Sequence, residues 1–190
     1  MVVETVAKFS MDVYRGFFDD DFFHSSEMRK WIGRANNERG HAFNSSVAKR
    51  LSELGWQTRE NLKVGAITGL SYATDLGDID VFAWHPSDSR VLIAECKDLF
   101  ADKTLGEMAR RLAKYRGGLD NKGRPDNLEK HTRRIAALRS APDAIAKFIG
   151  KSALELQPVL IFSQPTTVQF HENPELDGFL VMTKDDLVTL

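Results

Sequence analysis

The stretch GDIDVFAWHPSDSRVLIAECKD, residues 77–98, decides the fold. It contains two short apolar runs rich in β-branched and aromatic residues, Ile79–Trp84 and Val91–Cys96. Between them lie residues 85–90, a cluster of residue types that favour turns, including Pro86. This pattern predicts a β-hairpin with a loop of about six residues, slightly longer than the usual loop of about two to five.

Charged side chains gather at one end of this otherwise apolar hairpin. Because side chains alternate between the two faces of a strand, we expect Glu95 and Lys97 on one face and Cys96 on the other. Asp78 and Asp80 share a face of the first strand in the same way. Taken singly, these residues could form a surface ion pair or a turn. Together they indicate a functional site, because charges are rare on core strands unless they are paired or bind a metal.

The length and composition are those of a globular protein with one core. The chain has 190 residues, of which 42% are hydrophobic and 28% are charged, as in an ordinary soluble domain. No apolar run approaches the roughly 20 residues of a membrane helix, and no signal peptide is recognisable. A single cysteine excludes an internal disulfide and a zinc site built from cysteines. We therefore expect a cytoplasmic protein with no membrane partner.

The net charge of −1 conceals a basic block. Residues 103–139 contain eleven Lys and Arg against four Asp and Glu, a net charge of +7 that leaves −8 for the remainder. Such a block suits a polyanionic partner better than a membrane or an acidic small molecule. The alternative is a solvated helical face, which is the more common origin of a charge run.

Periodicity and capping signals predict an N-terminal helical extension, residues 1–39, followed by one α/β domain, residues 40–190. In the extension we expect helices over 2–14 and 27–34. In the domain we expect, besides the hairpin, helices over 41–55, 104–115, 128–138 and 142–148, strands over 57–64, 158–163, 167–170 and 178–182, and a helical turn after Thr183. This order predicts a mixed β-sheet flanked by helices.

Two segments of the hairpin, Gly77-Asp78-Ile79-Asp80 and Glu95-Cys96-Lys97, together resemble the motif of the PD-(D/E)xK nuclease superfamily. Within it, the archaeal Holliday-junction-resolvase and restriction-endonuclease-like branches are most similar. The resemblance covers about residues 40–182, where helix, strand, catalytic hairpin, helix and strand follow the order of the family. Agreement between the motif and this order makes the resemblance specific. It implies a restriction-endonuclease-like α/β fold.

The resemblance also implies a metal-dependent endonuclease that hydrolyses DNA phosphodiester bonds. Asp80 and Glu95 would be catalytic and would bind Mg²⁺, for which Mn²⁺ can substitute. The backbone carbonyl of Cys96 would be a further ligand. Carboxylate oxygens suit Mg²⁺, a hard cation that keeps several waters and binds substrate phosphates. Lys97 would be the third catalytic residue, since an ammonium group between two carboxylates stays protonated and can stabilise charge on a phosphate.

The helix before the strands departs from the resolvase-like pattern. That branch has a glutamate eleven residues before the glycine that ends its first helix; here the glycine is Gly55 and the matching residue is Asn44. Asparagine can ligate a metal without charge, and it is also a good N-cap. Asp78 could supply the missing charge, as could Glu38 if the helix extends back that far. The alternative function is therefore a catalytically weakened or inactive nuclease-fold module that binds nucleic acid.

The predicted helix after the hairpin carries four candidates for contacts with the DNA backbone: Arg110, Arg111, Lys114 and Arg116. Such contacts give salt-dependent affinity without sequence preference. We also consider a homodimer, which would allow paired cuts, and a protein partner docked on the segment Phe17–Phe23. Packing of these aromatic rings on the main domain is the simpler interpretation of that segment.

Overall fold

The computed structural model describes residues 24–102, 104–152 and 154–190. The helix expected over 2–14 and the segment Phe17–Phe23 lie outside the described residues. The chain divides into two compact units, Met1–Ala42 and Phe43–Leu190. In the first unit, Ser25 caps the beginning of a helix, since its Oγ accepts a hydrogen bond of 3.1 Å from the backbone N–H of Met28.

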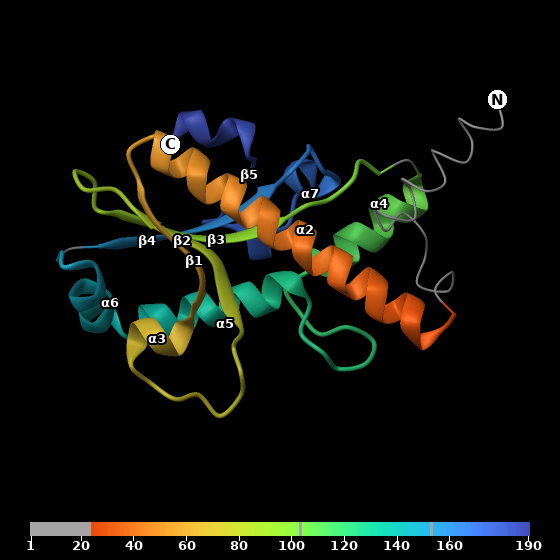
Figure 1. The fold of residues 1–190 in the computed structure, drawn as a ribbon, viewed down its shortest axis with the longest axis horizontal. Helices are drawn as coiled ribbons and strands as arrows, with labels where there is room; N and C mark the ends of the chain where they lie inside the picture. Colours follow the sequence, from red (N-terminus) through yellow and green to blue (C-terminus); the bar gives the residue numbers. More distant parts are fainter. Residues whose placement is uncertain (1–23, 103, 153) are drawn as a thin grey trace. The chain divides into compact units, whose positions relative to one another are not determined.

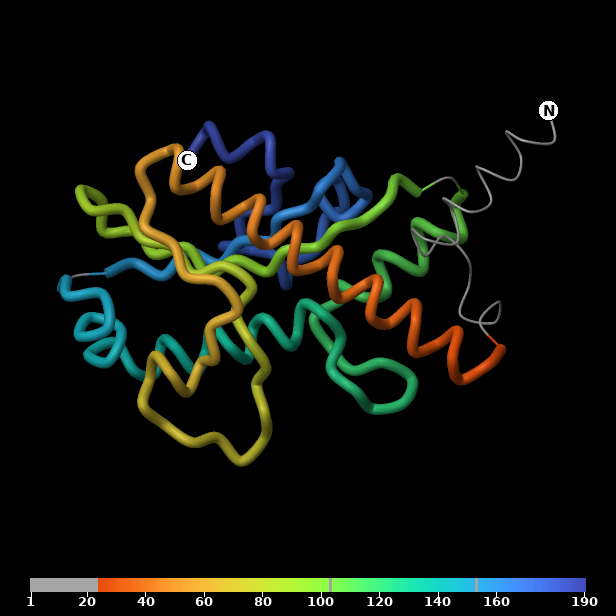
Figure 2. Tube along the Cα trace, in the orientation of Figure 1, coloured from red at the N-terminus to blue at the C-terminus, as the bar shows by residue number. Residues whose placement is uncertain are grey.

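The helices and strands follow one another as α2 (Ser26–Glu53), β1 (Gln57–Lys63), α3 (Val64–Thr68), β2 (Asp78–Trp84), β3 (Arg90–Lys97), α4 (Leu105–Leu112), η2 (Ala113–Tyr115), α5 (Asn127–Arg139), α6 (Pro142–Ile149), β4 (Glu155–Phe162), α7 (Thr167–Phe170), η3 (Pro174–Leu176), β5 (Leu180–Thr183) and η4 (Asp185–Thr189). Figures 1 and 2 show their arrangement. None of the helices in the described ranges is long and apolar enough to span a membrane.

The second unit is built on one five-stranded sheet with the order β1-β2-β3-β4-β5. Strands β1, β2 and β3 are antiparallel neighbours, whereas β4 and β5 continue the sheet in parallel. The expected hairpin is therefore β2–β3, and β3 is the central strand. The expectation of an α/β fold with a mixed sheet flanked by helices is confirmed.

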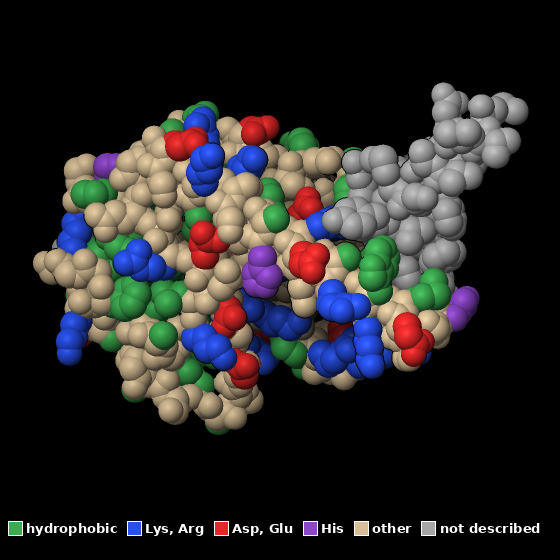
Figure 3. All heavy atoms as spheres, in the orientation of Figure 1, with side chains coloured by type: hydrophobic (Ala, Val, Ile, Leu, Met, Phe, Trp, Pro, Cys, Tyr) green, Lys and Arg blue, Asp and Glu red, His purple; other side chains and the backbone are tan. Residues whose placement is uncertain are grey.

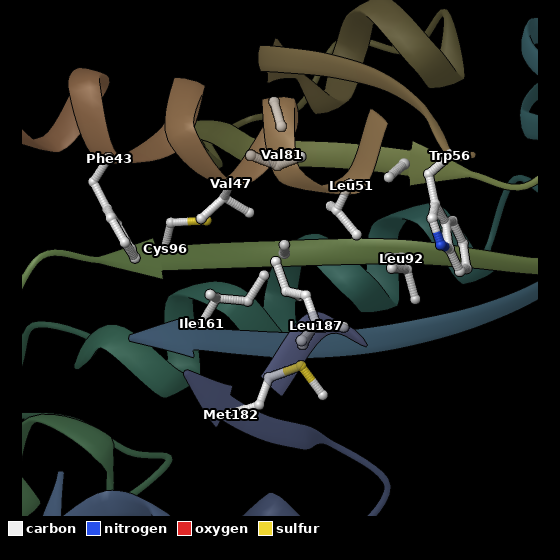
Figure 4. Packing of buried hydrophobic residues seen from close by; sticks show 14 residues of the cluster. Phe43, Val47, Leu51, Trp56, Val81, Leu92, Cys96, Ile161, Met182 and Leu187 are labelled. Atoms are coloured by element: carbon white, nitrogen blue, oxygen red, sulfur yellow. The ribbon is translucent and has the colours of Figure 1, made fainter. Parts of the chain in front are cut away.

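Helices cover both faces of this sheet (Figure 1). On one face, Phe43, Val47 and Leu51 of α2 pack on side chains of β2, β3 and β4 (Figure 4). On the other face, α3, α5 and α6 contribute to a second apolar cluster with β2 and β3. The hairpin is consequently buried on both sides, which explains why its two strands are almost continuously apolar.

Two expectations about local structure are wrong. The segments 27–34 and 41–55 belong to one helix, α2, that continues through Gly40. A glycine inside a helix costs only about 1 kcal/mol, and no proline interrupts the segment, so the helix does not end there. Residues 167–170 form the short helix α7 instead of a strand, because Thr166 and Gln169 make a capping box at its beginning.

Leu51 provides a test of the packing between α2 and the sheet. Its side chain is completely buried in the cluster with β2 and β3, so Leu51→Ala leaves a cavity and is expected to lower the free energy of unfolding by about 2–5 kcal/mol. Urea unfolding measures this loss. Lys49→Ala, an exposed change on the same helix, is the control and should shift the midpoint little. Equal midpoints for the two variants would contradict this account of the core.

Candidate active site

Asp80 and Glu95 face each other where the β2–β3 ladder ends. The last paired residues in the register are Val81 and Ala94, so one further step along both strands brings Asp80 opposite Glu95. Residues directly opposite in a sheet project to the same face, with Cβ atoms about 4.5–5.5 Å apart. The Asp80 carboxylate also ties the strands together, because its Oδ2 accepts a hydrogen bond of 2.8 Å from the backbone N–H of Cys96.

The site lies on the sheet face that α5 covers. Cys96 points to the opposite face, where its side chain is buried in the cluster with α2 (Figure 4). Glu95 and Lys97 alternate with it and therefore point toward α5, as expected from the sequence. Burial raises the pKa of the Cys96 thiol well above its usual value, which suits a core residue and not a nucleophile.

Two cationic side chains, Lys97 and Arg134, approach the carboxylates of Glu95 and Asp80. Lys97 Nζ lies 2.8 Å from Glu95 Oε1 and 4.0 Å from Asp80 Oδ2. Arg134 Nη1 of α5 lies 2.5 Å from Glu95 Oε2. Each oxygen of Glu95 is thus held by a different cation. The structure brings together Asp80, Glu95 and Lys97, the three predicted catalytic residues, and adds Arg134.

The pKa shifts follow from this crowding of charges. Burial and the neighbouring Glu95 raise the pKa of Asp80. Burial also favours the neutral form of Glu95, but Lys97 and Arg134 outweigh it and lower the pKa of Glu95 below its usual value. For Lys97, burial acts to lower the pKa, yet Glu95 and Asp80 raise it well above the usual range. Lys97 therefore carries its positive charge at every physiological pH.

Arg134 and His131 are the functional candidates that sequence reasoning did not place in the site. Both lie on the buried side of α5, where His131 Nε2 lies 3.1 Å from the backbone oxygen of Ile93. A signal was present, because His131, Arg134 and Ile135 follow the helical spacing of the apolar residues Leu128 and Leu138. Polar residues among the apolar residues on one side of a helix point toward the sheet. Their spacing alone does not identify the strand that they contact.

The donor set fits a divalent cation that needs few protein ligands. Asp80 and Glu95 supply hard carboxylate oxygens. Burial, and after it repulsion from Glu95, raises the pKa of Asp80, and a divalent cation would relieve the repulsion. No group of three or more His, Cys, Asp and Glu side chains suited to a metal occurs in the described part of the chain. Mg²⁺ is commonly bound by one or two carboxylates together with water and phosphate, and two carboxylates are what Asp80 and Glu95 would offer it.

Two of the auxiliary candidates, Asn44 and Asp78, form no hydrogen bond or ion pair with this cluster among the residues that the structure describes. Asn44 is buried, and its Nδ2 donates a hydrogen bond of 3.2 Å to Oδ1 of Asn61 on β1. Asp78 is exposed and lies opposite Lys63 in the β1–β2 register. Helix α2 does extend back through Glu38, as the proposal for this residue requires.

The four predicted DNA-contacting residues differ in their surroundings. Arg111 forms an ion pair of 3.0 Å with Asp102, in which the Arg111 side chain is only 16% exposed. Arg110, Lys114 and Arg116 are exposed. Lys114 and Arg116 flank Tyr115, a buried residue close enough to Lys97 and Glu95 for each to influence its pKa, which burial raises to about 12.

The basic block is partly neutralised by acids. Besides Arg111 and Arg134, it contains Arg124, paired with Asp120 at 2.8 Å, and Arg133, paired with Glu129 at 2.6 Å. On the face shown in Figure 3, Lys and Arg side chains accordingly lie among Asp and Glu side chains. The basic block therefore combines exposed cations with cations that are paired to acids, and its surface is not uniformly basic.

The fold and the site define an α/β protein with a charged acid–lysine–arginine cluster where two central strands end. The family model described as "Anti-phage protein Upx-like" matches residues 3–188, which is nearly the whole chain. The protein therefore belongs to the Upx-like family of anti-phage proteins. No curated protein and no solved structure matched the chain.

His131 generates a prediction about pH. Burial lowers its pKa from 6.5 to about 4, although Glu95 opposes this shift, so the unfolded chain takes up a proton more readily than the folded protein. The stability that neutral His131 provides is present above pH 6.5 and is lost as the pH falls toward 4. Between pH 7 and pH 5 we expect a loss of about 2 kcal/mol in the free energy of unfolding.

Urea unfolding at pH 7 and pH 5 measures this loss in the wild-type protein and in His131→Gln, which keeps a donor for the Ile93 carbonyl. The variant should lose less stability on acidification. His171→Gln, at an exposed position, should behave like the wild type. An unchanged pH dependence in His131→Gln would show that another group is responsible.

Proposed function

We propose that the protein is a metal-dependent nuclease that hydrolyses phosphodiester bonds, with DNA as its substrate. The observation that carries this proposal is the contact of Lys97 Nζ with Glu95 at 2.8 Å and its approach to Asp80 at 4.0 Å, on a face away from the thiol of Cys96. Two acids and a lysine on one side of a strand end are the groups that the PD-(D/E)xK resemblance requires. The element order of α2, β1, β2, β3, the following helices and β4 also agrees with that resemblance.

Asp80, Glu95 and the backbone carbonyl of Cys96 would hold the metal. When bound, Mg²⁺ supplies a positive centre that lowers the pKa of a coordinated water and offsets charge on the phosphate. Lys97 contributes a charged donor that orients the attacking water and stabilises the negative charge that develops on the phosphate oxygens. Its raised pKa makes it unsuited to accept a proton, so its role is electrostatic and not that of a general base.

The substrate class follows from charge and position. Lys114 and Arg116 flank Tyr115 beside the site and make no ion pair within the described ranges, so they are available to bind phosphates on either side of the reacting one. Contacts of this type provide affinity that depends on salt and not on sequence. A nuclease of low sequence preference would act on invading phage DNA, which agrees with the anti-phage description of the family.

A second candidate function is binding of nucleic acid without cleavage. It is favoured by Asn44, which bonds to Asn61 where the resolvase-like pattern has an acid. The full pairing of Glu95 with Lys97 and Arg134 favours it as well. Such a module would bind DNA with an affinity that falls steeply as the salt concentration rises. It would not cleave DNA with any divalent metal.

The nuclease proposal predicts the effect of three substitutions, Asp80→Asn, Glu95→Gln and Lys97→Met. Each removes a charge from the site at nearly constant volume, and each should lower the cleavage rate by about 100-fold or more. Cleavage of labelled DNA with Mg²⁺ or Mn²⁺, and its loss with EDTA, is the measurement. Lys147→Met, on α6 and exposed, is the matched control.

Circular dichroism must show that the variants are folded. Cleavage that persists in all three variants would rule out this site. Retention of DNA without cleavage by the wild-type protein under every metal tested would support the binding module in its place.

The proposed DNA contact predicts the behaviour of Lys114→Ala/Arg116→Ala. Loss of two phosphate contacts should weaken binding uniformly across DNA sequences and reduce the slope of log affinity against log salt by about 2. Fluorescence anisotropy of labelled duplexes over a salt series measures both effects. Lys147→Ala should leave the slope unchanged, and an unchanged slope in the double variant would remove these residues from the interface.

A further inference from the structure

Arg134 belongs to the basic block in the sequence, but its side chain is buried against Glu95 and does not face solvent. Its Nη1 lies 2.5 Å from Glu95 Oε2, with side chains only 10% and 7% exposed. A buried guanidinium that is paired with a proposed metal ligand cannot contribute to a solvated surface. Its charge is instead paired with the carboxylate of Glu95.

The guanidinium of Arg134 is held in place from a second direction. Its Nε donates a hydrogen bond of 2.7 Å to the backbone oxygen of Leu76. The next residue, Gly77, has a φ of +75°, and a Cβ atom there would lie 3.0 Å from Arg134 Nη2. The absence of a side chain at Gly77 thus makes room for the guanidinium. Lys97 differs, since its side chain is 31% exposed and sits on a flexible stem.

The four charged groups of the cluster cancel. Asp80 and Glu95 provide two negative charges, and Lys97 and Arg134 provide two positive charges. The net charge of the cluster is therefore zero and does not attract a divalent cation. A metal ion that approaches Glu95 must also compete with the two cations already bound there. A phosphate group brings the missing negative charge and is also a ligand for Mg²⁺.

We propose that Arg134 is a positioning residue that couples metal binding to nucleic-acid binding. It holds Glu95 in place and cancels one carboxylate charge, so that the metal binds weakly alone and tightly once a phosphate is present. Lys97, the more mobile cation, is the one released from Glu95 toward the phosphate. This inference rests on the proposed function, because it assumes that Asp80 and Glu95 bind the metal.

The test compares the wild-type protein with Arg134→Gln, which removes the charge but keeps a hydrogen-bond donor. Titration with Mn²⁺ in the absence of DNA, followed by the electron paramagnetic resonance signal of free Mn²⁺, gives the metal affinity. Arg134→Gln should bind Mn²⁺ about tenfold more tightly or better, since a unit charge a few ångströms away acts strongly in a partly desolvated site. Arg133→Gln, the exposed neighbour on α5, should match the wild type, and Arg134→Lys, which keeps the charge, should lie near it.

The coupling has its own readout. Anisotropy of labelled duplex DNA with and without Ca²⁺ should show a large metal-dependent gain in DNA affinity for the wild-type protein and a smaller gain for Arg134→Gln, because coupling between two ligands is reciprocal. Equal or weaker Mn²⁺ binding by folded Arg134→Gln would overturn the inference. If Arg134→Gln does not fold, Gly77→Ala, which crowds the guanidinium, replaces it. An unchanged Mn²⁺ affinity in that variant would overturn the inference equally.

If the proposed function is wrong, the same measurements give a different result. In that case the wild-type protein binds no Mn²⁺ with or without DNA, and Asp80→Asn changes nothing. Tight Mn²⁺ binding that Asp80→Asn abolishes, together with identical affinities in the wild type and Arg134→Gln, would keep the metal site and remove only the role of Arg134.

Discussion

Everything in the site follows from the placement of two carboxylates opposite each other on neighbouring strands. Like charges in directly opposed positions destabilise a sheet, and burial adds a desolvation cost for each. The structure offsets both costs around Asp80 and Glu95 with a backbone N–H from Cys96, the ammonium group of Lys97 and the guanidinium of Arg134. Charge balance at this strand end thus dictates which side chains surround it.

The rest of the fold holds this arrangement in place. Strand β3 is paired on both sides, antiparallel to β2 and parallel to β4, and apolar clusters cover both faces of the hairpin. Helix α2 packs on the face that receives Cys96, whereas α5 packs on the face that receives Glu95 and Lys97 and carries Arg134 to them. The two helices therefore have different tasks: α2 supplies apolar packing, and α5 supplies both packing and a charge.

Membership of the Upx-like anti-phage family gives this chemistry a biological setting. Defence against phage requires that an activity toward nucleic acid does not damage the host at rest. Under the proposed coupling, a cluster that is electrically neutral without its substrate would meet that requirement, because the metal would be recruited only when a phosphate arrives. The ion pairs that Asp102, Asp120 and Glu129 form with arginines of the basic block would, under the same proposal, limit non-specific attraction to nucleic acid.

The sequence by itself determined the hairpin, the faces of Glu95, Lys97 and Cys96, and the mixed sheet, because strand periodicity and capping are local properties of neighbouring residues. It also determined which acids and which lysine meet, since antiparallel pairing places the two ends of one hairpin together. Only the tertiary structure decided that α2 is continuous, that Asn44 bonds to Asn61 and that Arg134 reaches Glu95. The last two contacts join separate elements of the chain, and the packing of helices on a sheet, which no short pattern encodes, selects them. Helix α2 is continuous because the small cost of Gly40 does not end it.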